Sequence, residues 1–579
     1  MSTKLAAVSF PRLGAHRELK NLVEGYWLGR VSKETLMTGS RQLRETQWSM
    51  QREAGIDYIS SNDFSFYDHM LDMACLLNVI PSRYRFLAED ELECYFAMAR
   101  GVQNRKGDVT ALDMKKWFNT NYHYIVPEIE SDLDLNLNGI KPFAEYREAQ
   151  ACGINTKPVI IGPYTFLKLS KHKSRLSLVR LLEHFIPVYQ EIISRFAALG
   201  LPTLQIDEPA IVMAMNPGEQ SAFYHTYKKL LAVRGDTQIL LQTYFGDIRD
   251  IYAKVMSLDF DAVGLDLVEG GKNLELIESY GFPSDKQLFA GLVNGKNIWI
   301  NNYARTMDKI KHLLKYVNSE QVVLNTSCSL LHVPYSAEYE VKLGAEYRPY
   351  LSFAREKLNE LGDLKELLED SDYPHNDRFI ANQALVNKLS NHPAKHRPEV
   401  RARLKSLTGA DYVRHPCYKE RIEAQKKGLG LPKLPTTTIG SFPQTAEVRQ
   451  LRQQFRKGLI DEDEYKRQIK EHIGQVILLQ EDLGFDVLVH GEYERNDRVE
   501  YFGENLEGFI FTENGWVQSY GTRGVKPPII FGDVKRSRSI TVEWIAYAQS
   551  LTDRPVKGML TGPITILHWS YPREDLDQS

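Results

Sequence analysis

The segment Gly162-Pro163-Tyr164-Thr165-Phe166-Leu167 recurs 400 positions later as Gly562-Pro563-Ile564-Thr565-Ile566-Leu567. Two other segments recur in the same order: Ser9-Phe10-Pro11 returns as Ser441-Phe442-Pro443, and Gln51-x3-Gly55-x-Asp57 returns as Gln480-x3-Gly484-x-Asp486. The preserved order predicts a duplicated domain. Because only 17 residues follow Gly562, we expect the second copy to be incomplete in this chain.

Length and composition predict a large globular protein. A chain of 579 residues exceeds the single-core limit of roughly 250–300 residues, which indicates two large domains. The net charge of −3 argues against nucleic acid or an acidic membrane as the main partner. Five cysteines without a C-x-x-C pair suit a reducing compartment. Without a membrane-length apolar run or a signal-peptide core, we expect the cytosol.

In the first 357 residues, short apolar segments alternate with amphipathic ones such as Phe185–Leu199. The predicted strands are Ala7–Phe10, Tyr58–Ser60, Tyr122–Val126, Pro158–Ile161, Thr203–Ile206, Gln238–Leu241, Ala262–Leu265, Leu288–Leu292 and Val322–Asn325. The alternation indicates an α/β fold with parallel strands and crossover helices. A (βα)8 barrel fits better than an open sheet, since no G-x-G-x-x-G follows the first strand. A barrel needs eight strands, so we expect Tyr122–Val126 to be an extra or edge strand.

Three domains follow from this pattern: an N-terminal (βα)8 barrel over 1–357, a charged, partly helical connector over 358–432, and the first half of a second (βα)8 barrel over 433–579. In the second copy, strands are predicted at Thr436–Ile439, Asp486–Val489 and Gly558–Thr561, with a hairpin at Phe509–Gln518 around Asn514-Gly515. Ser32 and Asp461 occupy equivalent repeat positions and are predicted helix N-caps.

Acidic residues follow several predicted strands. Asp63 and Glu492 coincide at an offset of 429, and acids at the carboxyl ends of barrel strands face the active-site mouth. Such a carboxylate could hold the ammonium of an amino acid, or it could be a helix cap or a buried structural acid. The pair Asp207-Glu208 could serve proton transfer or bind a cationic group, or it could belong to a hydrogen-bond network at the barrel rim.

Basic and aromatic residues are the other candidates. Arg17, Lys20, Lys116 and Arg523 would suit a polyanionic substrate if they met at one mouth; the alternative is a set of solvated surface charges. Trp569 could stack on a planar heterocycle or pack in the core. The sequence contains no G-x4-G-K-[ST], H-E-x-x-H or G-x-S-x-G motif.

Six segments together carry a resemblance to a known family. They are Phe10-Pro11-Arg12-x-Gly14-x2-Arg17-Glu18-Leu19-Lys20, Lys116-Trp117-Phe118-Asn119-Thr120-Asn121-Tyr122-His123-Tyr124, Gln205-Ile206-Asp207-Glu208-Pro209-Ala210, Thr436-Thr437-Thr438-Ile439-Gly440-Ser441-Phe442-Pro443-Gln444, Val489-His490-Gly491-Glu492 and Gly515-Trp516-Val517-Gln518-Ser519-Tyr520-Gly521. Over essentially its whole length the chain resembles the cobalamin-independent methionine synthases, the 5-methyltetrahydropteroyltriglutamate–homocysteine S-methyltransferases.

The resemblance implies two face-to-face (βα)8 barrels with the active site between them, mostly on the second. It assigns the folate's glutamate tail to Arg17, Glu18, Leu19, Lys20 and Lys116, the border of the folate to Arg523 and Gly524, and the pterin to Trp569. It assigns homocysteine to Ile439, Gly440 and Ser441, and the homocysteine ammonium to Glu492. The family often has a cysteine where this chain has Gly524, which leaves only a backbone contact there.

The implied reaction is direct methyl transfer from 5-methyltetrahydropteroyltri-L-glutamate to L-homocysteine, without cobalamin, in a monomer. In the family, zinc deprotonates the homocysteine thiol, which is otherwise mostly protonated at neutral pH. The family's zinc ligands, proton-donor histidine and second homocysteine-binding acid would all lie beyond Ser579. We therefore expect neither a metal ligand nor a catalytic acid in this chain, and no turnover by it.

Two other functions remain open at this point. One is a non-catalytic relative that binds polyglutamyl folate; the other is a duplicated-barrel methyltransferase with a different methyl donor or thiol. The presence of Lys116-Trp117-Phe118 together with Arg17 and Lys20 favours the polyglutamate donor.

Overall fold

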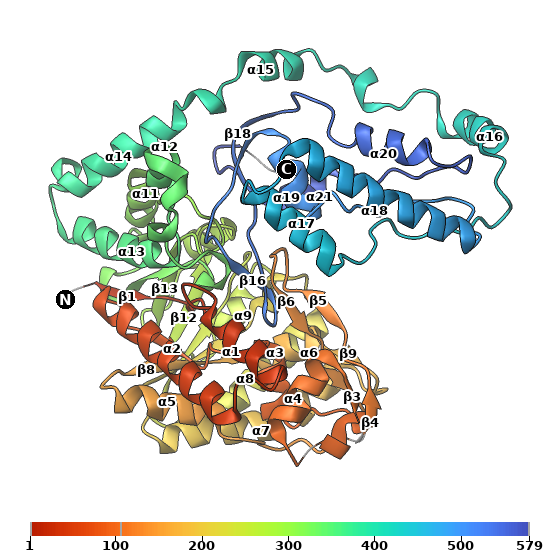
Figure 1. Ribbon diagram of the computed structural model, residues 1–579. Coiled ribbons are helices and arrows are strands. Elements are labelled where there is room, and N and C mark those ends of the chain that lie inside the picture. The colour runs from red at the N-terminus through yellow and green to blue at the C-terminus, as the bar shows by residue number, and fades with distance from the viewer. Residues whose placement is uncertain (1–2, 88, 105–106, 132, 577–579) are drawn as a thin grey trace. The chain divides into compact units, whose positions relative to one another are not determined.

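The structure is a computed structural model that describes residues 3–87, 89–104, 107–131 and 133–576. The chain forms two compact units (Figure 1). The first contains Met1–Leu389 and Thr512–Lys526, and the second contains Ser390–Phe511 and Pro527–Ser579. This division differs from the predicted boundary after residue 357. α13 (Ala354–Glu369) spans that boundary, buries leucines such as Leu361 and packs on strands of the first unit. The domain limits of the sequence analysis stay a prediction.

Eight parallel strands form the centre of the first unit. They are β1 (Lys4–Ala6), β2 (Ile59–Ser61), β8 (Thr156–Ile161), β10 (Thr203–Asp207), β11 (Gln238–Gln242), β12 (Ala262–Asp266), β13 (Gln287–Val293) and β14 (Val322–Thr326). They pair in the order β1-β14-β13-β12-β11-β10-β8-β2, and a parallel bridge between Ala6 and Tyr58 joins the two ends of the row. The prediction of a (βα)8 barrel in the first copy is confirmed.

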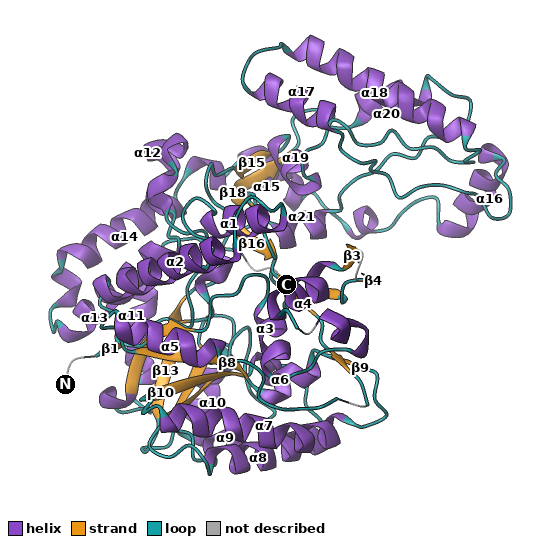
Figure 2. Cartoon of the chain, turned by 60° about the horizontal axis from the view of Figure 1, so that its bottom comes forward, coloured by secondary structure: helices purple, strands orange, loops and turns teal. Residues whose placement is uncertain are grey.

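Helices flank this ring of strands (Figure 2). In chain order they are α1 (Glu18–Trp27), α2 (Lys33–Glu53), α3 (His69–Leu76), α4 (Glu91–Arg100), α5 (Lys141–Ala151), α6 (Pro163–Lys168), α7 (Leu178–Ala198), α8 (Pro217–Leu231), α9 (Tyr252–Met256), α10 (Lys272–Tyr280) and α11 (Tyr303–Leu313). The predicted amphipathic helix is α7, whose buried face includes Phe185, Ile192 and Phe196. Ser32 caps α2 as predicted, because its side chain accepts a hydrogen bond from the Thr35 N–H.

The ninth predicted strand of the first copy lies outside the barrel. β6 (His123–Ile125) pairs antiparallel with β5 (Met114–Lys116) in a separate two-stranded sheet. The expectation that this segment is an extra strand is confirmed. Two other small pairs join β3 (Val102–Asn104) to β4 (Gly107–Val109) and β7 (Glu128–Ile129) to β9 (Lys171–His172).

The second unit is mainly helical. Its helices are α15 (Pro398–Lys405), α16 (Tyr418–Leu429), α17 (Ala446–Arg456), α18 (Glu462–Asp482), α19 (Arg498–Glu504), α20 (Val542–Gln549) and α21 (Pro563–Trp569), and α14 (Asp377–Ser390) ends at its start. Asp461 caps α18 as predicted. Parallel bridges join Thr437 to Val487 and Leu488 to Val556, which is the order of β1, β2 and β8 in the first unit. The second barrel itself stays a prediction.

The hairpin predicted at Phe509–Gln518 is wrong. β15 (Glu507–Ile510) pairs instead with β18 (Ile529–Lys535), and the hairpin joins β16 (Val517–Tyr520) to β17 (Arg523–Val525). The backbone N–H groups of Glu513 and Asn514 donate to the Glu340 carboxylate at 2.5 and 2.8 Å. The Asn514 turn therefore attaches this segment to the first unit rather than reversing the chain between two strands.

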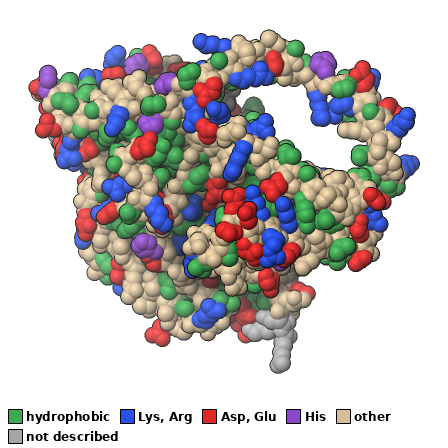
Figure 3. All heavy atoms as spheres, turned by 45° about the horizontal axis from the view of Figure 1, so that its top comes forward, with side chains coloured by type: hydrophobic (Ala, Val, Ile, Leu, Met, Phe, Trp, Pro, Cys, Tyr) green, Lys and Arg blue, Asp and Glu red, His purple; other side chains and the backbone are tan. Residues whose placement is uncertain are grey.

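The surface carries both charges. On the face drawn in Figure 3, Lys and Arg side chains are interspersed with Asp and Glu side chains, in keeping with the net charge of −3. Within the described ranges, none of the helices is both long enough and apolar enough to cross a membrane.

Limited proteolysis should distinguish the two copies of the repeat. Large apolar side chains are exposed in the second copy, including Leu434, Leu483, Leu560 and Ile564, whereas the strands of the first copy close into a ring. Apolar exposure and open strand edges favour local opening. We expect trypsin, followed by mass spectrometry, to cleave within 433–511 or 527–576 before it cleaves within 1–350. Equal cleavage rates in the two regions would contradict this.

Candidate functional site

The β16–β17 hairpin of the first unit contacts residues that the resemblance assigns to the folate. The Arg17 guanidinium lies 3.9 Å from the centroid of the Trp516 ring, which is cation–π geometry. Arg17 precedes α1 in a left-handed conformation, with φ 63°. Gly524 faces the same pair, because a Cβ there would lie 3.3 Å from Trp516 and 3.8 Å from Arg17.

The first turn of α1 is linked to the hairpin through Glu24, which lies in the next turn of the same helix. Lys20 pairs with Glu24, and the Thr522 hydroxyl donates to the same carboxylate at 2.9 Å. The other two predicted residues of this turn have structural contacts. Leu19 is buried in the core, and Glu18 accepts a hydrogen bond from the His16 N–H at 3.0 Å. Arg17 and Lys20 are therefore the members of this turn that bring positive charge to the hairpin.

Arg523 lies on β17 of the hairpin itself, and Lys116 lies on β5, whose partner strand β6 contacts β16. Lys116 pairs with His123 across the β5–β6 ladder, and the His123 ring lies 6.2 Å from that of Tyr520. Arg523 Nη1 donates to the Tyr520 hydroxyl at 3.2 Å. Burial lowers the pKa of Lys116 and that of His123. All four predicted cations thus lie around one hairpin, an arrangement that suits a polyanion.

In the second unit, three of the residues assigned to homocysteine lie together. Ser441 bridges Gly491, next to Glu492. Gly440 faces the Glu492 side chain, since a Cβ at Gly440 would lie 2.7 Å from Glu492 Oε1. Gly440 has φ +155° and Glu492 has φ +59°. For a non-glycine residue the left-handed conformation of Glu492 is uncommon and marks functional positions more often than others. Ile439 precedes this group with its side chain exposed.

Two residues that support Glu492 and its neighbours were missed by the sequence analysis. The Arg495 guanidinium lies 3.5 Å from Glu492 and donates to the Met559 carbonyl at 2.9 Å. Lys557 Nζ donates to the Thr438 carbonyl at 2.7 Å, which holds the segment before Gly440. The repeat could have identified Lys557, since Lys157 stands 400 positions earlier and donates to the Ala7 carbonyl of its own copy at 2.9 Å.

Trp569 is the last residue of α21 and belongs to the second unit, whereas Arg523 and Gly524 belong to the first. Its side chain is half-buried. Stacking of Trp569 on a pterin stays a prediction.

The predicted acid pair at the end of β10 separates into two environments. Glu208 is fully buried and accepts hydrogen bonds from the Tyr164 and Thr165 N–H groups and from the Tyr227 hydroxyl, at 3.0, 2.6 and 2.6 Å. Burial raises the pKa of Glu208 to about 7. These contacts favour the interpretation that Glu208 belongs to a hydrogen-bond network at the barrel rim, rather than serving proton transfer or binding a cationic group. Asp207 and Asp63 instead line a cavity at the barrel mouth.

The residues that the structure describes do not provide a metal site. Across the described ranges, no three His, Cys, Asp or Glu side chains come together in a group that could hold a metal ion. Cys328 is buried, as expected from its sequence context. The zinc site that the resemblance implies therefore does not fit the residues that the structure describes.

Comparisons with known proteins show which chains this one is similar to. Residues 4–318 match the family model "Cobalamin-independent synthase, N-terminal domain", and residues 434–579 match "Cobalamin-independent synthase, Catalytic domain". The chain is 51% identical to the 5-methyltetrahydropteroyltriglutamate–homocysteine methyltransferase of Campylobacter jejuni (strain RM1221), covering 99% of this chain and 75% of that protein. It is also 51% identical to the transferase of the same name from Bifidobacterium longum (strain NCC 2705), covering 100% and 75%.

Among solved structures, a B12-independent methionine synthase from Shewanella sp. W3-18-1 in complex with selenomethionine aligns with 59% of this chain and 90% of its own, at a TM-score of 0.41 and 15% identity. A superposition this distant carries no weight here.

The buried carboxyl of Glu208 predicts a pH dependence of stability. The pKa of Glu208 is about 7 in the folded protein, above its ordinary value of 4.5, so the folded state holds the proton more tightly. As the pH rises from about 5 to 8, the free energy of unfolding should fall by about 2–3 kcal/mol more in the native chain than in Glu208→Gln, which cannot ionise. Urea denaturation at both pH values measures this difference.

The matched control for that prediction is Glu420→Gln, at an exposed position of α16. It should show the same pH dependence as the native chain. Equal pH dependence in the native chain and in Glu208→Gln would contradict the prediction.

Proposed function

We infer the function from the family to which this chain belongs, the cobalamin-independent methionine synthases, and propose that it serves methyl transfer from 5-methyltetrahydropteroyltri-L-glutamate to L-homocysteine, which forms L-methionine. The observation that carries the proposal is 51% identity over essentially the whole chain to transferases of that name. Both family models match as well. The family works without cobalamin.

The first unit would hold the glutamate tail of the methyl donor. Arg17, Lys20, Lys116 and Arg523 lie around one hairpin, and a triglutamate tail carries several carboxylates that such cations bind. Trp516 would orient Arg17, because the guanidinium rests on its ring. The border of the folate would be formed by Arg523 and Gly524, and the pterin contact of Trp569 enters the proposal through the resemblance alone.

The second unit would hold homocysteine. Glu492 offers a carboxylate for the α-ammonium, and Arg495 on one side of that carboxylate would orient it. Ser441 and the backbone of Ile439 and Gly440 would contact the rest of the amino acid. Holding both substrates in register lowers the entropic cost of a two-substrate reaction, and these residues can supply that part of catalysis.

Zinc enters this proposal only through the family resemblance. When bound, the metal would supply a thiolate from homocysteine, but the described residues do not form a group that could hold it. No step is therefore assigned to a metal here. A second (βα)8 barrel, the domain limits 1–357, 358–432 and 433–579, a cytosolic location and a monomeric state are likewise proposals.

The direct test of the function incubates the 579-residue chain with both substrates and measures binding of each, together with methionine formation. Saturable binding of L-homocysteine and of the triglutamate donor supports the substrate assignment whether or not turnover occurs. A chain that binds the donor but not homocysteine would favour the non-catalytic folate-binding relative. Failure to bind either would sink the proposal.

The dependence of folate affinity on the length of the glutamate tail tests the proposed methyl donor. Lys116→Ala should weaken binding of the triglutamate donor about tenfold, because a charged hydrogen bond is lost, and should change monoglutamate binding little. Lys115→Ala is the matched control, since Lys115 points to the opposite face of β5. Fluorescence titration with both folates measures the effect. Equal affinity of the native chain for the two folates would favour a different methyl donor.

Replacement of the proposed ammonium ligand tests the homocysteine site. Glu492→Gln should weaken L-homocysteine binding by about 1.5–3 kcal/mol, the range for a hydrogen bond to a charged group. Isothermal titration calorimetry measures the change, with Glu447→Gln, at an exposed position of α17, as control. An unchanged dissociation constant would remove Glu492 from this role.

A further inference from the structure

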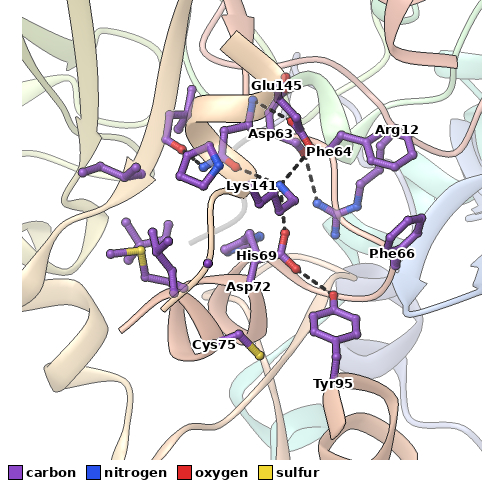
Figure 4. A pocket seen from close by; sticks show the side chains of 18 of the residues that line it. Arg12, Asp63, Phe64, Phe66, His69, Asp72, Cys75, Tyr95, Lys141 and Glu145 are labelled. Carbon is purple, nitrogen blue, oxygen red and sulfur yellow. Dashed lines mark hydrogen bonds and ion pairs between the residues drawn. The ribbon is translucent and has the colours of Figure 1, made fainter. Parts of the chain in front are cut away.

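A cavity of about 680 Å³ lies at the mouth of the first barrel, where the carboxyl ends of the strands meet (Figure 4). Ser9 and Phe10 follow β1, Asp63 follows β2, Asp207 ends β10 and Tyr244 follows β11, and all five line it. Ligands of (βα)8 barrels bind at this face, and the volume is typical of small-molecule sites. The residues discussed above for folate and homocysteine are not part of its lining.

The internal repeat relates this cavity to the second copy. Ser9 stands at the position of Ser441, and Asp63 stands at that of Glu492, at offsets of 432 and 429. The first barrel therefore has a hydroxyl and a carboxylate where the second copy has the groups proposed to bind an amino acid. This step rests on the proposed role of Glu492; the steps that follow rest on the cavity itself.

Two carboxylates give the cavity an acidic side. Asp63 Oδ2 accepts hydrogen bonds from the Phe10 N–H at 3.0 Å and the Ser60 hydroxyl at 2.6 Å. Asp207 accepts from the Gln205 amide at 2.7 Å and the Tyr244 hydroxyl at 3.0 Å. These four donors are uncharged. The ammonium of buried Lys157 also attracts both carboxylates electrostatically, but its hydrogen bonds run to the Ala7 carbonyl and to Gln205 Oε1. Lone pairs of both acids therefore remain for the ammonium group of a ligand.

Two side-chain nitrogen atoms of the cavity wall could bind an anionic group. Arg12 is 2% exposed; its Nη2 donates to the Tyr122 hydroxyl at 2.6 Å and its Nη1 to the Asp63 carbonyl at 3.3 Å. Among the described residues, the buried Nε of Arg12 and the buried Nε2 of His69 have no hydrogen-bond partner. Both residues line the cavity. The Arg12 Nε–H is a buried donor without an acceptor, which is costly, and a carboxylate would satisfy it. The same carboxylate would also accept from His69 Nε2 in the tautomer that carries its proton there.

Several other charged residues of the cavity wall pair with one another. Lys141 lies 3.2 Å from both Asp72 and Glu145 and donates to the Asn62 side chain at 2.8 Å. The Tyr95 hydroxyl donates to Asp72 at 2.7 Å. Figure 4 shows this network beside Arg12, Asp63 and His69. The two acids and the two nitrogen atoms lie outside this paired network.

We propose that the mouth of the first barrel is a second ligand site, which binds a small α-amino acid as its zwitterion. The ammonium pairs with Asp63 and Asp207, and the carboxylate accepts from Arg12 Nε and His69 Nε2. An apolar side chain lies against the ring of Phe10 and the side chain of Leu331, which also line the cavity.

Calorimetric titration of the full chain with L-methionine tests the proposal. The native chain should show two classes of site, and Glu492→Gln should retain one of them. In the Glu492→Gln background, Asp207→Asn should weaken the remaining site at least tenfold. Asp285→Asn, whose side chain is 75% exposed, should leave it unchanged. L-Methioninol, which lacks the carboxylate, and 4-(methylthio)butanoic acid, which lacks the ammonium, should each bind at least tenfold more weakly than L-methionine.

Hydrogen–deuterium exchange of the unmutated chain locates the ligand without relying on variants. L-Methionine should slow exchange in peptides that cover 59–76 and 203–211. Protection confined to 434–579, or no loss of binding in Asp207→Asn, would overturn the proposal. If Glu492→Gln binds L-methionine with native stoichiometry while 59–76 is protected, the role of Glu492 fails and the first-barrel site stands.

Discussion

The closure of eight parallel strands into one ring is the constraint on which the first unit depends. β1 makes the closing contact: Ala6 bridges Tyr58, the Leu5 carbonyl accepts from the Tyr58 N–H at 3.1 Å, and the Leu5 N–H donates to Asp57 at 2.7 Å. Buried Lys157 ties β8 to the Ala7 carbonyl. Because all strands run in one direction, their carboxyl ends meet at one mouth, which is why Asp63 and Asp207, 144 positions apart, line the same cavity.

A second constraint is the attachment of the β16–β17 hairpin to the first unit. Gly521 sits against Tyr67 so closely that a Cβ would overlap the ring. Buried Gln518 donates to the Gly521 carbonyl at 2.6 Å and holds the turn. These contacts place Arg523 beside the residues that precede and begin α1, so that positive charges from distant parts of the chain come together. The proposed binding of a polyanionic tail depends on this attachment of the hairpin to the first unit.

Seven of the eight barrel strands, the caps and the extra strand could be predicted because each has a local cause. The first strand was predicted at Ala7–Phe10, but β1 ends at Ala6. Apolar runs such as Leu288–Leu292 become buried barrel strands, and Ser32 and Asp461 cap their helices through their own neighbours. The position of the hairpin could not be predicted. Asn514-Gly515 is a good local turn signal. However, the Glu340 carboxylate accepts hydrogen bonds from the backbone N–H groups of Glu513 and Asn514. The leucines of α13, such as Leu361, indicate a helix with a buried face, but they do not indicate the strands on which that face packs.

The sequence by itself determined the internal repeat of motifs, the alternation of strands and helices in the first copy, the helix caps and, through its motifs, the family. Each of these depends on spacing along the chain, which the sequence displays directly. Only the tertiary structure decided that 512–526 belongs to the first unit, that Glu208 serves the barrel rim while Asp207 faces a cavity, and that Arg12 Nε is buried without an acceptor. Those outcomes depend on contacts between residues tens to hundreds of positions apart, whose partners no local pattern specifies.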